Sequence, residues 1–318
     1  MRYIMKRYLL LLLVLTLSFA ATFAADESTI TIKTSKPVGT SVSLDAYTSS
    51  KDEAFTVDWG DGEEKIYNID PNGYGYSRRI NTEIKGGTIT IKGKLVNFDF
   101  TKAGITSIEL HGQTAMKVIN LKENEIATFA QDGMPALTEL NLRDNKLTKF
   151  MGTGMTSLTE LNLQGNQLDS HEFDITDASA TLTELNVSDN GDKFITLNLM
   201  PFTALEYFYC DDNPEFTTAV FADNNENIKK ISMNNCYVMH FYSRSFPNLT
   251  SLNLSHNALL ELEEGNYPKL SSLSINHNYL TELDVTRFPK LESLYCGNNN
   301  ITLLNVGSNP ELLSLNCD

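Results

Sequence analysis

The sequence predicts a mainly β solenoid of about eleven coils of 21–24 residues, capped at its N-terminus by a small β-sandwich-like domain. Apolar residues fall into regular columns from Leu95 onward, and their spacing within each row is that of a short strand followed by a turn. The residues before Leu95 alternate like β strands and lack this period. With one strand per coil, joined by loops or short 3₁₀ turns, we expect little α-helix.

Residues 1–24 have the organisation of a secretory signal peptide. Three basic residues within the first seven positions precede the apolar run Leu9–Leu17, and small residues lead to Ala24. The apolar run is shorter than the ~20 residues of a membrane-spanning helix. We therefore expect cleavage near Ala24 and export of the mature chain.

The chain is strongly acidic. Its formal net charge is −15, and subtracting the three basic residues of the signal segment brings it to −18. Such a chain repels nucleic acid and anionic membrane surfaces, both of which need a basic patch. We expect a soluble mature protein with no nucleic-acid partner and no membrane insertion.

Residues 25–94 are predicted to form a separate small β domain. Thr29–Thr34 and Thr88–Ile91 alternate and are rich in β-branched residues, and Val42–Leu44 and Phe55–Trp59 indicate further strands. The open end of a solenoid exposes apolar core. The simplest role of this domain is therefore to act as an N-terminal cap over the first repeat.

The segment Val57-Asp58-Trp59-Gly60-Asp61-Gly62 resembles the W-D-F-G-D-G signature of polycystic kidney disease (PKD)-type immunoglobulin-like domains, with departures at Val57 and Trp59. The resemblance implies a small β sandwich. Asp58 and Asp61 can be interpreted as calcium ligands or as parts of a hairpin turn. The motif lacks the spaced carboxylates of a calcium loop, and Asp-Gly is typical of hairpins, so we favour the turn.

The repeat domain spans residues 95–318, and its last row is incomplete. Most rows read L-x-x-L-x-L-x-x-N-x-L, in which L-x-L is a short strand with its leucines inward. Because no single coil can bury its own leucines, stability comes from stacking. The rows begin at Leu95, Met116, Leu137, Leu158, Leu182, Leu205, Ile228, Leu249, Leu270, Leu291 and Leu312.

The ninth position of the row is asparagine in eight rows and Cys236 in one. An asparagine amide both donates and accepts hydrogen bonds, so it can satisfy backbone groups of the turn that face away from water. We predict a structural ladder made of Asn124, Asn145, Asn166, Asn190, Asn213, Asn257, Asn278 and Asn299.

The row from Leu291 has a cysteine in its third apolar slot, and its pattern residues are Leu291, Leu294, Cys296, Asn299, Ile301, Leu304 and Val306. Such rows resemble internalin-type leucine-rich repeats, and in particular the internalin J-like variant with cysteine in the third apolar slot. The resemblance covers residues 95–318. It implies an exported bacterial protein, secreted or at the cell surface, with the periplasm as the alternative, and a role in adhesion or recognition.

Cys210, Cys296 and Cys317 occupy this third apolar slot, so we expect free, buried thiols that behave as small apolar residues. Cys296 and Cys317 lie in adjacent rows, which leaves a disulfide as the alternative. His256 and His277 share the column before the asparagine slot. They could share a metal or sense pH, but we favour solvent-exposed side chains and expect no metal site.

Partner recognition should use the exposed third, fifth and seventh positions of each row. Glu139, Glu160 and Glu184 follow one another in the third position. Stacked like charges are destabilising unless Arg143 or a basic partner offsets them, although a charge column can also be a solvated face.

A second surface feature lies in the aromatic-rich stretch between Phe202 and Phe246. Exposed tyrosines are good anchors for proteins and sugars, whereas drift on a tolerant surface is the alternative. The predicted contact residues are Tyr207, Tyr209, Asp211, Lys230 and Tyr295.

The sequence contains no hydrolase, metalloprotease, phosphate-binding or dinucleotide-binding motif, so we expect neither catalysis nor a cofactor. The favoured function is an exported, adhesin-like recognition protein that binds an extracellular protein or glycan through its strand face. A carbohydrate-binding accessory or inhibitor of a secreted enzyme is the alternative. The last row has no capping segment, which leaves end-to-end self-association or further sequence beyond Asp318 as explanations.

Overall fold

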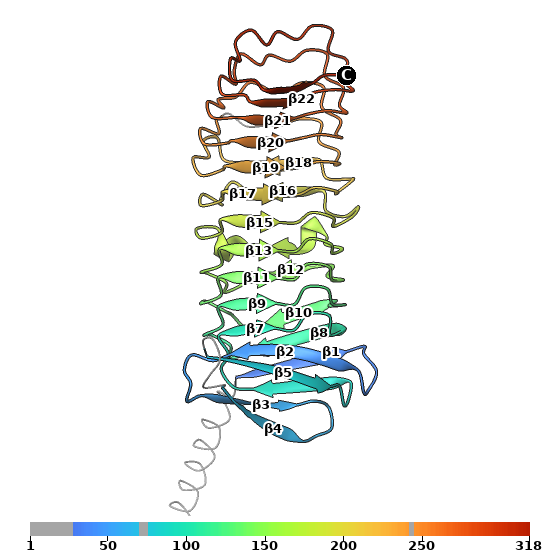
Figure 1. Ribbon diagram of the computed structural model, residues 1–318, viewed down its shortest axis with the longest axis vertical. Coiled ribbons are helices and arrows are strands. Elements are labelled where there is room, and N and C mark those ends of the chain that lie inside the picture. The colour runs from blue at the N-terminus through green and yellow to red at the C-terminus, as the bar shows by residue number, and fades with distance from the viewer. Residues whose placement is uncertain (1–27, 70–75, 242–244) are drawn as a thin grey trace, which may run out of the picture.

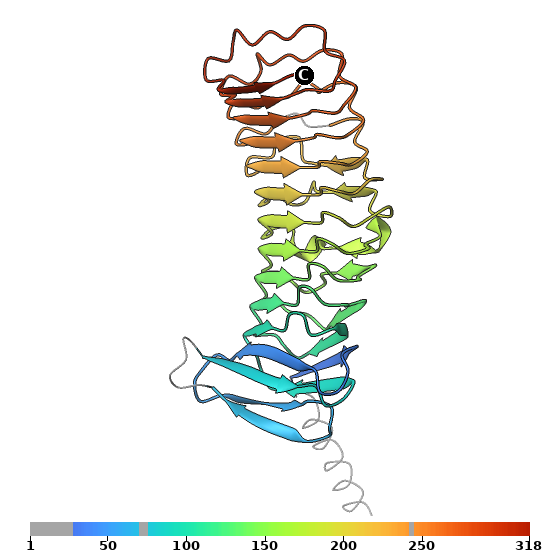
Figure 2. The same cartoon turned by 45° about the vertical axis from the view of Figure 1, so that its right-hand side comes forward.

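The computed structural model describes residues 28–69, 76–241 and 245–318. The predicted signal peptide lies outside these described residues. Over the described part of the chain the protein is a gently bent rod of stacked coils with a β domain at one end (Figures 1 and 2). The described residues contain two short 3₁₀ helices and no α-helix. The predicted fold class, a mainly β solenoid, is confirmed.

One long sheet forms the strand face of the rod. Eleven of its strands are parallel and contiguous in the described structure, joined by ten pairings that correspond to about ten full coils. Each has three residues: β7 (Asn97–Asp99), β9 (Val118–Asn120), β11 (Glu139–Asn141), β13 (Glu160–Asn162), β15 (Glu184–Asn186), β17 (Tyr207–Tyr209), β19 (Lys230–Ser232), β20 (Ser251–Asn253), β21 (Ser272–Ser274), β22 (Ser293–Tyr295) and β23 (Ser314–Asn316).

The alternation within each three-residue strand sets which side chains are buried. In β11 and β13 the central leucines, Leu140 and Leu161, lie in register and point into the core, while Glu139 pairs with Glu160 on the outer side. The same register repeats along the stack. Consequently each outward position of the row becomes a continuous column along the rod.

The return side of the coils carries shorter and less regular elements. These are β8 (Ile105–His111), β10 (Thr128–Gln131), β12 (Phe150–Met151), β14 (Phe173–Asp174), β16 (Thr196–Asn198), β18 (Thr218–Val220) and the 3₁₀ helices η1 (Ser170–Glu172) and η2 (Thr176–Ala178). Both 3₁₀ helices lie in the row from Leu158, which has extra residues to accommodate. Beyond β18, strand-type pairing between the described return segments is limited to one isolated bridge, Ser245 to Asn266.

Aromatic side chains pack ring to ring behind this return side. Phe173 and Phe194 meet edge to face with centroids 5.6 Å apart, and Phe194 and Phe216 stack at 5.9 Å. A second series continues through Phe246, whose centroid lies 6.2 Å from that of Tyr267. Much of the aromatic enrichment in this part of the sequence therefore fills the core.

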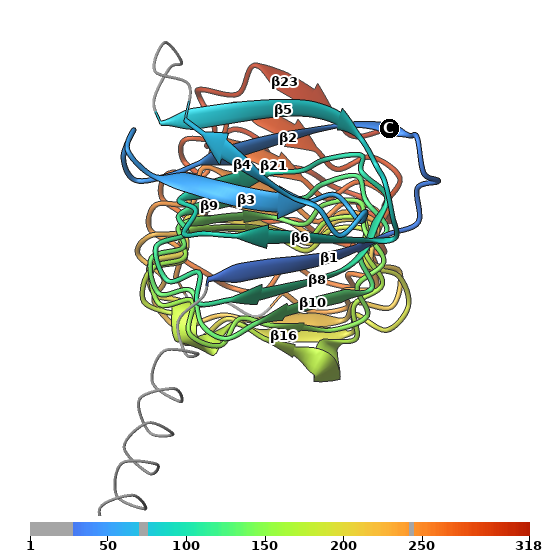
Figure 3. The same ribbon diagram turned by 90° about the horizontal axis from the view of Figure 1, so that it is seen from below.

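The N-terminal region forms two antiparallel sheets that merge with the solenoid. Its strands are β1 (Thr29–Thr34), β2 (Ser41–Tyr47), β3 (Ala54–Asp58), β4 (Glu64–Asn68), β5 (Ser77–Glu83) and β6 (Thr88–Lys92). Strand β2 pairs with β7 and extends the long sheet, while β1 pairs with β8 of the first row. Seen along the rod, these strands lie across its end (Figure 3). Trp59 is buried beneath them, 6.2 Å from the Phe100 ring.

The Asp-Gly segment between β3 and β4 is a hairpin turn. An oxygen of the Asp58 carboxylate accepts hydrogen bonds from the backbone N–H groups of Gly60 and Gly62, at 2.8 and 3.0 Å. Asp61 pairs with Lys85. Gly60 has φ +102°, and a Cβ there would lie 2.5 Å from the Gly86 backbone, so glycine is required. Both carboxylates thus have partners, Asp58 within the turn and Asp61 in Lys85, which follows β5.

Each ladder asparagine bridges its own coil and the preceding one. Asn213, which is fully buried, donates to the carbonyl oxygens of Cys210 (2.9 Å) and Val187 (3.1 Å) and accepts from the Asn190 N–H (2.8 Å). Donation by the side-chain amide to its own coil and to the one before recurs at the seven other predicted ladder positions. The amide therefore satisfies buried turn groups in two coils at once.

All four cysteines are free thiols. Cys210, Cys236 and Cys296 are buried, and the Cys236 thiol donates to the Cys210 carbonyl oxygen at 3.1 Å. The expectation of a buried thiol is wrong for Cys317, which is exposed. The reason is that burial in the third apolar slot requires a coil packed on each side, and no described coil packs on the far side of the last row.

We expect Asn213→Ala to lower the free energy of unfolding by about 3 kcal/mol or more, because it leaves two carbonyls and one N–H of two coils unsatisfied in the core. Urea unfolding followed by circular dichroism measures this change. Asn224→Ala, which removes an exposed amide bonded to Glu226, is the control and should change stability by less than about 0.5 kcal/mol. Equal losses of unfolding free energy in the two variants would show that the buried ladder amide stabilises the fold no more than an exposed amide does.

We also expect a thiol reagent to label one cysteine, Cys317, in the native protein. Burial raises the pKa of the Cys296 thiol to about 11 and that of Cys210 well above its usual value, and only the thiolate reacts. Mass spectrometry of the labelled protein should find one modified cysteine under native conditions and four in denaturant. Fewer than four in denaturant without reductant would indicate a disulfide.

Candidate partner-binding strand face

A groove of about 480 Å³ opens on the strand face where the solenoid meets the N-terminal sheet. We call it the strand-face groove. Its ionisable walls are Asp45, Arg79, Asp99, Glu139, Glu160 and Glu184, with asparagines of the fifth position between them. Five carboxylates face one guanidinium, so the groove has a negative potential that favours basic groups.

The three predicted glutamates form one column in this groove. Glu139 lies opposite Glu160, and Glu160 lies opposite Glu184, in adjacent parallel strands. Among the described residues none of the three forms an ion pair, and Arg143 instead binds Asp144 at 3.1 Å. The structure thus leaves the charge column without the internal partner that the sequence suggested as one possibility.

Glu184 is the most perturbed member of the column. Partial burial raises its pKa above the usual value, the neighbouring Glu160 carboxylate raises it further, and Lys230 opposes the shift. Ionised Glu184 is therefore less stable in the folded chain than in water. A cationic partner placed against the column would relieve this repulsion.

Two of the groove carboxylates come from outside the predicted set. Asp45 on β2 accepts a bidentate pair of hydrogen bonds from Arg79 on β5, at 2.7–3.1 Å, which raises the pKa of the guanidinium. Asp99 on β7 accepts from the side-chain amide of Asn120 at 2.8 Å. No repeat-based signal marks Asp45 or Arg79, because they reach the groove only through the long-range pairing of β2 with β7.

The predicted tyrosines continue the strand face directly beyond the glutamates. Tyr207 lies opposite Glu184 in the register, and both Tyr207 and Tyr209 are half-buried. The Lys230 ammonium lies 5.0 Å from the Tyr209 ring centroid, within cation–π range. Burial raises the pKa of the Tyr209 phenol, and Glu184 adds to the shift.

The remaining predicted contact residues differ in how they are placed. Asp211 is half-buried, and one of its carboxylate oxygens accepts from the Ser232 hydroxyl (2.6 Å) and the Asn234 N–H (2.7 Å), so it helps to hold the coil. Tyr295 is exposed but lies four strand steps from Tyr209, on β22. The structure therefore gathers Glu139, Glu160, Glu184, the two tyrosines and Lys230 into one surface and leaves Tyr295 apart.

The two histidines of the repeat column meet on the turn edge of the rod. The rings of His256 and His277 stack with centroids 4.2 Å apart and planes inclined by 17°, and both residues are exposed. Each residue has a left-handed backbone conformation, with φ of 55° and 56°. This position of the coil bends the chain immediately before the ladder asparagine.

Comparisons with known proteins agree with this geometry. Two family models, both described as leucine rich repeat, match residues 130–168 and residues 178–191 and 247–261. The fold is that of a leucine-rich-repeat solenoid. A search of the curated proteins found no significant match.

Two solved structures are similar to the chain. One is the functional domain of InlJ from Listeria monocytogenes, which includes a cysteine ladder, with 23% identity and a TM-score of 0.60 over 73% of this chain and 50% of that one. The other is YopM from Yersinia enterocolitica WA-314, with 23% identity and a TM-score of 0.48 over 66% and 48%. This chain thus spans about half the length of the two proteins. Its similarity to the InlJ domain is a similarity of fold.

Over residues 28–69, 76–241 and 245–318, no helix combines the length and apolar character required to span a membrane.

We expect Glu184→Gln to stabilise the protein at pH 7, by about 0.5 kcal/mol, the size of a cross-strand charge effect. Because folding raises the pKa of Glu184, its ionised carboxylate destabilises the folded state. This destabilisation is absent when pH lies below the usual carboxyl value of 4.5 and fully present above the raised pKa. The urea midpoint of the variant should therefore exceed that of the wild type at pH 7 and match it at low pH. Glu292→Gln, an exposed control outside the groove, should show no such pH-dependent gain.

Proposed function

We propose that this protein is an exported, non-catalytic recognition protein that binds a protein partner through the strand-face groove and the adjoining tyrosines. The observation that carries the proposal is the column of three glutamates without an ion-pair partner among the described residues. Stacked carboxylates destabilise the folded protein. A basic surface on a partner would offset their repulsion and so contribute to affinity and specificity.

The neighbouring aromatic surface gives the groove an apolar margin. Tyr207 and Tyr209 are rigid side chains with few rotatable bonds, and Lys229 and Lys230 flank their rings at 5.8 and 5.0 Å from the centroids. Aromatic anchors beside a charged groove are typical of protein interfaces, where the charges steer the encounter and the rings provide buried area. This combination favours a protein ligand with basic and apolar groups side by side.

Export and an adhesin-like role rest on the N-terminal signal pattern and on the internalin-type character of the repeats. The PKD-like β domain would serve as the cap of the first coil, and β2 and β5 would add one wall of the groove. An extracellular or surface location would place this groove where partners from other cells can reach it.

A second function is supported by the tyrosines alone. Two adjacent aromatic rings can stack on sugar rings, so the protein could be a carbohydrate-binding accessory, or an inhibitor, of a secreted enzyme. Glycan binding would depend on Tyr207 and Tyr209 and be insensitive to salt. Protein binding through the glutamates would weaken as salt screens the charges.

The experiment is a binding screen of residues 25–318 on immobilised extracellular-matrix proteins and glycans. We expect a protein ligand whose affinity falls about tenfold or more in the triple variant Glu139→Gln/Glu160→Gln/Glu184→Gln, and falls also between about 50 mM and about 500 mM salt. A control with the same charge change, Glu215→Gln/Glu226→Gln/Glu292→Gln, alters exposed carboxylates outside the groove and should retain binding.

The double variant Tyr207→Ala/Tyr209→Ala separates the two functions. A glycan ligand lost only in this variant, with no salt dependence, would establish the carbohydrate alternative. Full binding in both the triple and the double variant, with the fold intact by circular dichroism, would show that the strand face is not the recognition surface.

A further inference from the structure

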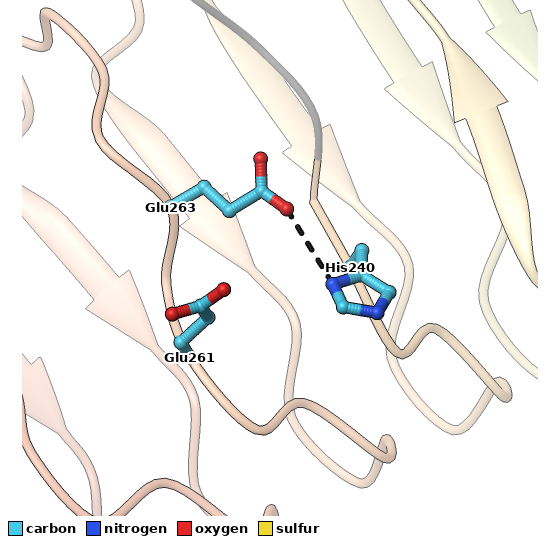
Figure 4. Close-up of side chains that lie close together, drawn as sticks. All are labelled: His240, Glu261 and Glu263. Atoms are coloured by element: carbon cyan, nitrogen blue, oxygen red, sulfur yellow. Dashed lines mark ion pairs between the residues drawn. The ribbon is translucent and has the colours of Figure 1, made fainter.

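The return side of the solenoid carries a cluster of metal-binding side chains away from the strand face. His240 comes from one coil, and Glu261 and Glu263 come from the next, in the described segment that follows β18 (Figure 4). The three side chains present ligand atoms that all lie within 4.8 Å of one another. From this mixed nitrogen and oxygen set we infer that His240, Glu261 and Glu263 bind a divalent cation of the zinc class, which joins two coils.

The distance between the two best-placed ligands matches this chemistry. His240 Nδ1 lies 3.4 Å from the nearer carboxylate oxygen of Glu263. Two ligands about 2.1 Å from a tetrahedral metal are about 3.4 Å apart. Glu261 is exposed, so its side chain can rotate inward to supply the third ligand. An imidazole with two carboxylates suits zinc and similar transition ions, whereas calcium prefers oxygen ligands alone.

The backbone that carries the two glutamates is held in place from the following coil. The Arg287 guanidinium donates to the carbonyl oxygens of Glu263 (2.8 Å) and Leu262 (3.0 Å). The guanidinium contacts carbonyl oxygens of this loop and leaves the Glu263 carboxylate directed toward His240, with Glu261 beside it (Figure 4). A site whose ligands are already positioned loses less entropy on binding.

A second observation points to a ligand at this loop. The Tyr267 side chain is 1% exposed, and its hydroxyl has no hydrogen-bond partner in the described structure. The hydroxyl lies 2.6 Å from where a Cβ would stand on Gly265, two residues beyond Glu263. A buried hydroxyl costs free energy unless it is satisfied, and a metal-bound water at this loop is a candidate partner for it.

The surroundings add a cation-attracting field. Glu261 and Glu263 form part of the wall of a cavity of about 1150 Å³, whose lining also includes Asp223, Glu282 and Asp284. Among the described residues of that lining, Arg287 is the one cation. Such a wall raises the local concentration of divalent ions.

The position explains what the ion would do for the fold. Beyond β18 the described return segments lack strand pairing apart from the bridge between Ser245 and Asn266. Arg287 joins the coil of Glu263 to the next one, and a metal at His240 would join it to the previous one. The cation would thus add a side-chain cross-link at a step of the stack where the Phe246 N–H already donates to the Asn266 carbonyl oxygen at 3.0 Å.

The test is calorimetric titration of the full-length chain, free of any histidine tag and stripped of metal by a chelator, with Zn²⁺ and separately with Ca²⁺. We expect one Zn²⁺ site whose occupation raises the thermal unfolding midpoint by several degrees. His240→Ala should weaken Zn²⁺ binding by about tenfold or more and abolish the thermal shift. Glu261→Gln, which is nearly isosteric on an exposed position, should do the same without disturbing the fold.

Two control variants test three of the other four histidines. His171→Ala removes an exposed imidazole paired with a single carboxylate, Asp169, at 3.0 Å, and His256→Ala/His277→Ala removes the stacked pair. Both should retain the Zn²⁺ site and its thermal shift. No stoichiometric Zn²⁺ binding by the wild type, loss only in the stacked-pair control, or Ca²⁺ binding unaffected by His240→Ala would each overturn the inference.

Discussion

The stacked coils depend on one buried amide at the turn after most of the strands. Every coil must bend sharply within its core, and the bend turns backbone N–H and C=O groups away from water, where each unsatisfied group is costly. A ladder asparagine such as Asn213 both donates and accepts, and so bonds backbone groups of its own coil and of the preceding one. The residue before it adopts the left-handed conformation that starts the bend, as at Asp212. Leucine burial provides the driving force, but the amide decides where each coil closes.

This closure has an electrostatic consequence for the surface. Because every strand is held in the same register, whatever occupies the third position of one row stands beside the same position of the next. A repeated glutamate thus becomes a charge column, and no backbone adjustment can separate its members. The N-terminal sheet adds Asp45 and Arg79 to the end of this column through the pairing of β2 with β7. The result is an acidic groove that the solenoid alone would not form.

The repeat made most of the fold predictable from sequence, because residues 21 to 24 apart that share a pattern must stack. The columns of glutamates and the tyrosines beside them followed from counting positions. Counting repeat positions could not predict contacts between segments that do not share the repeat pattern. The merging of β1 and β2 with the first coils, the partner of Arg143, and the meeting of His240 with Glu263 depend on long-range pairing or on side-chain direction. Cys317 likewise shows that a position in the repeat predicts burial only when coils pack on both sides.

The two sides of the rod are therefore held together by different forces. On the strand face, backbone hydrogen bonds join each coil to its neighbours, so the outward side chains can vary without loosening the stack. On the return side beyond β18, regular strand pairing ends among the described residues. There, side chains add to scattered backbone hydrogen bonds, through stacked rings such as Phe246 and Tyr267 and through the hydrogen bonds of Arg287 to backbone carbonyls. Recognition fits the strand face, because backbone hydrogen bonds rather than most of its outward side chains hold the coils together there. A cation that links coils fits the return side, because there each new cross-link adds to the integrity of the stack.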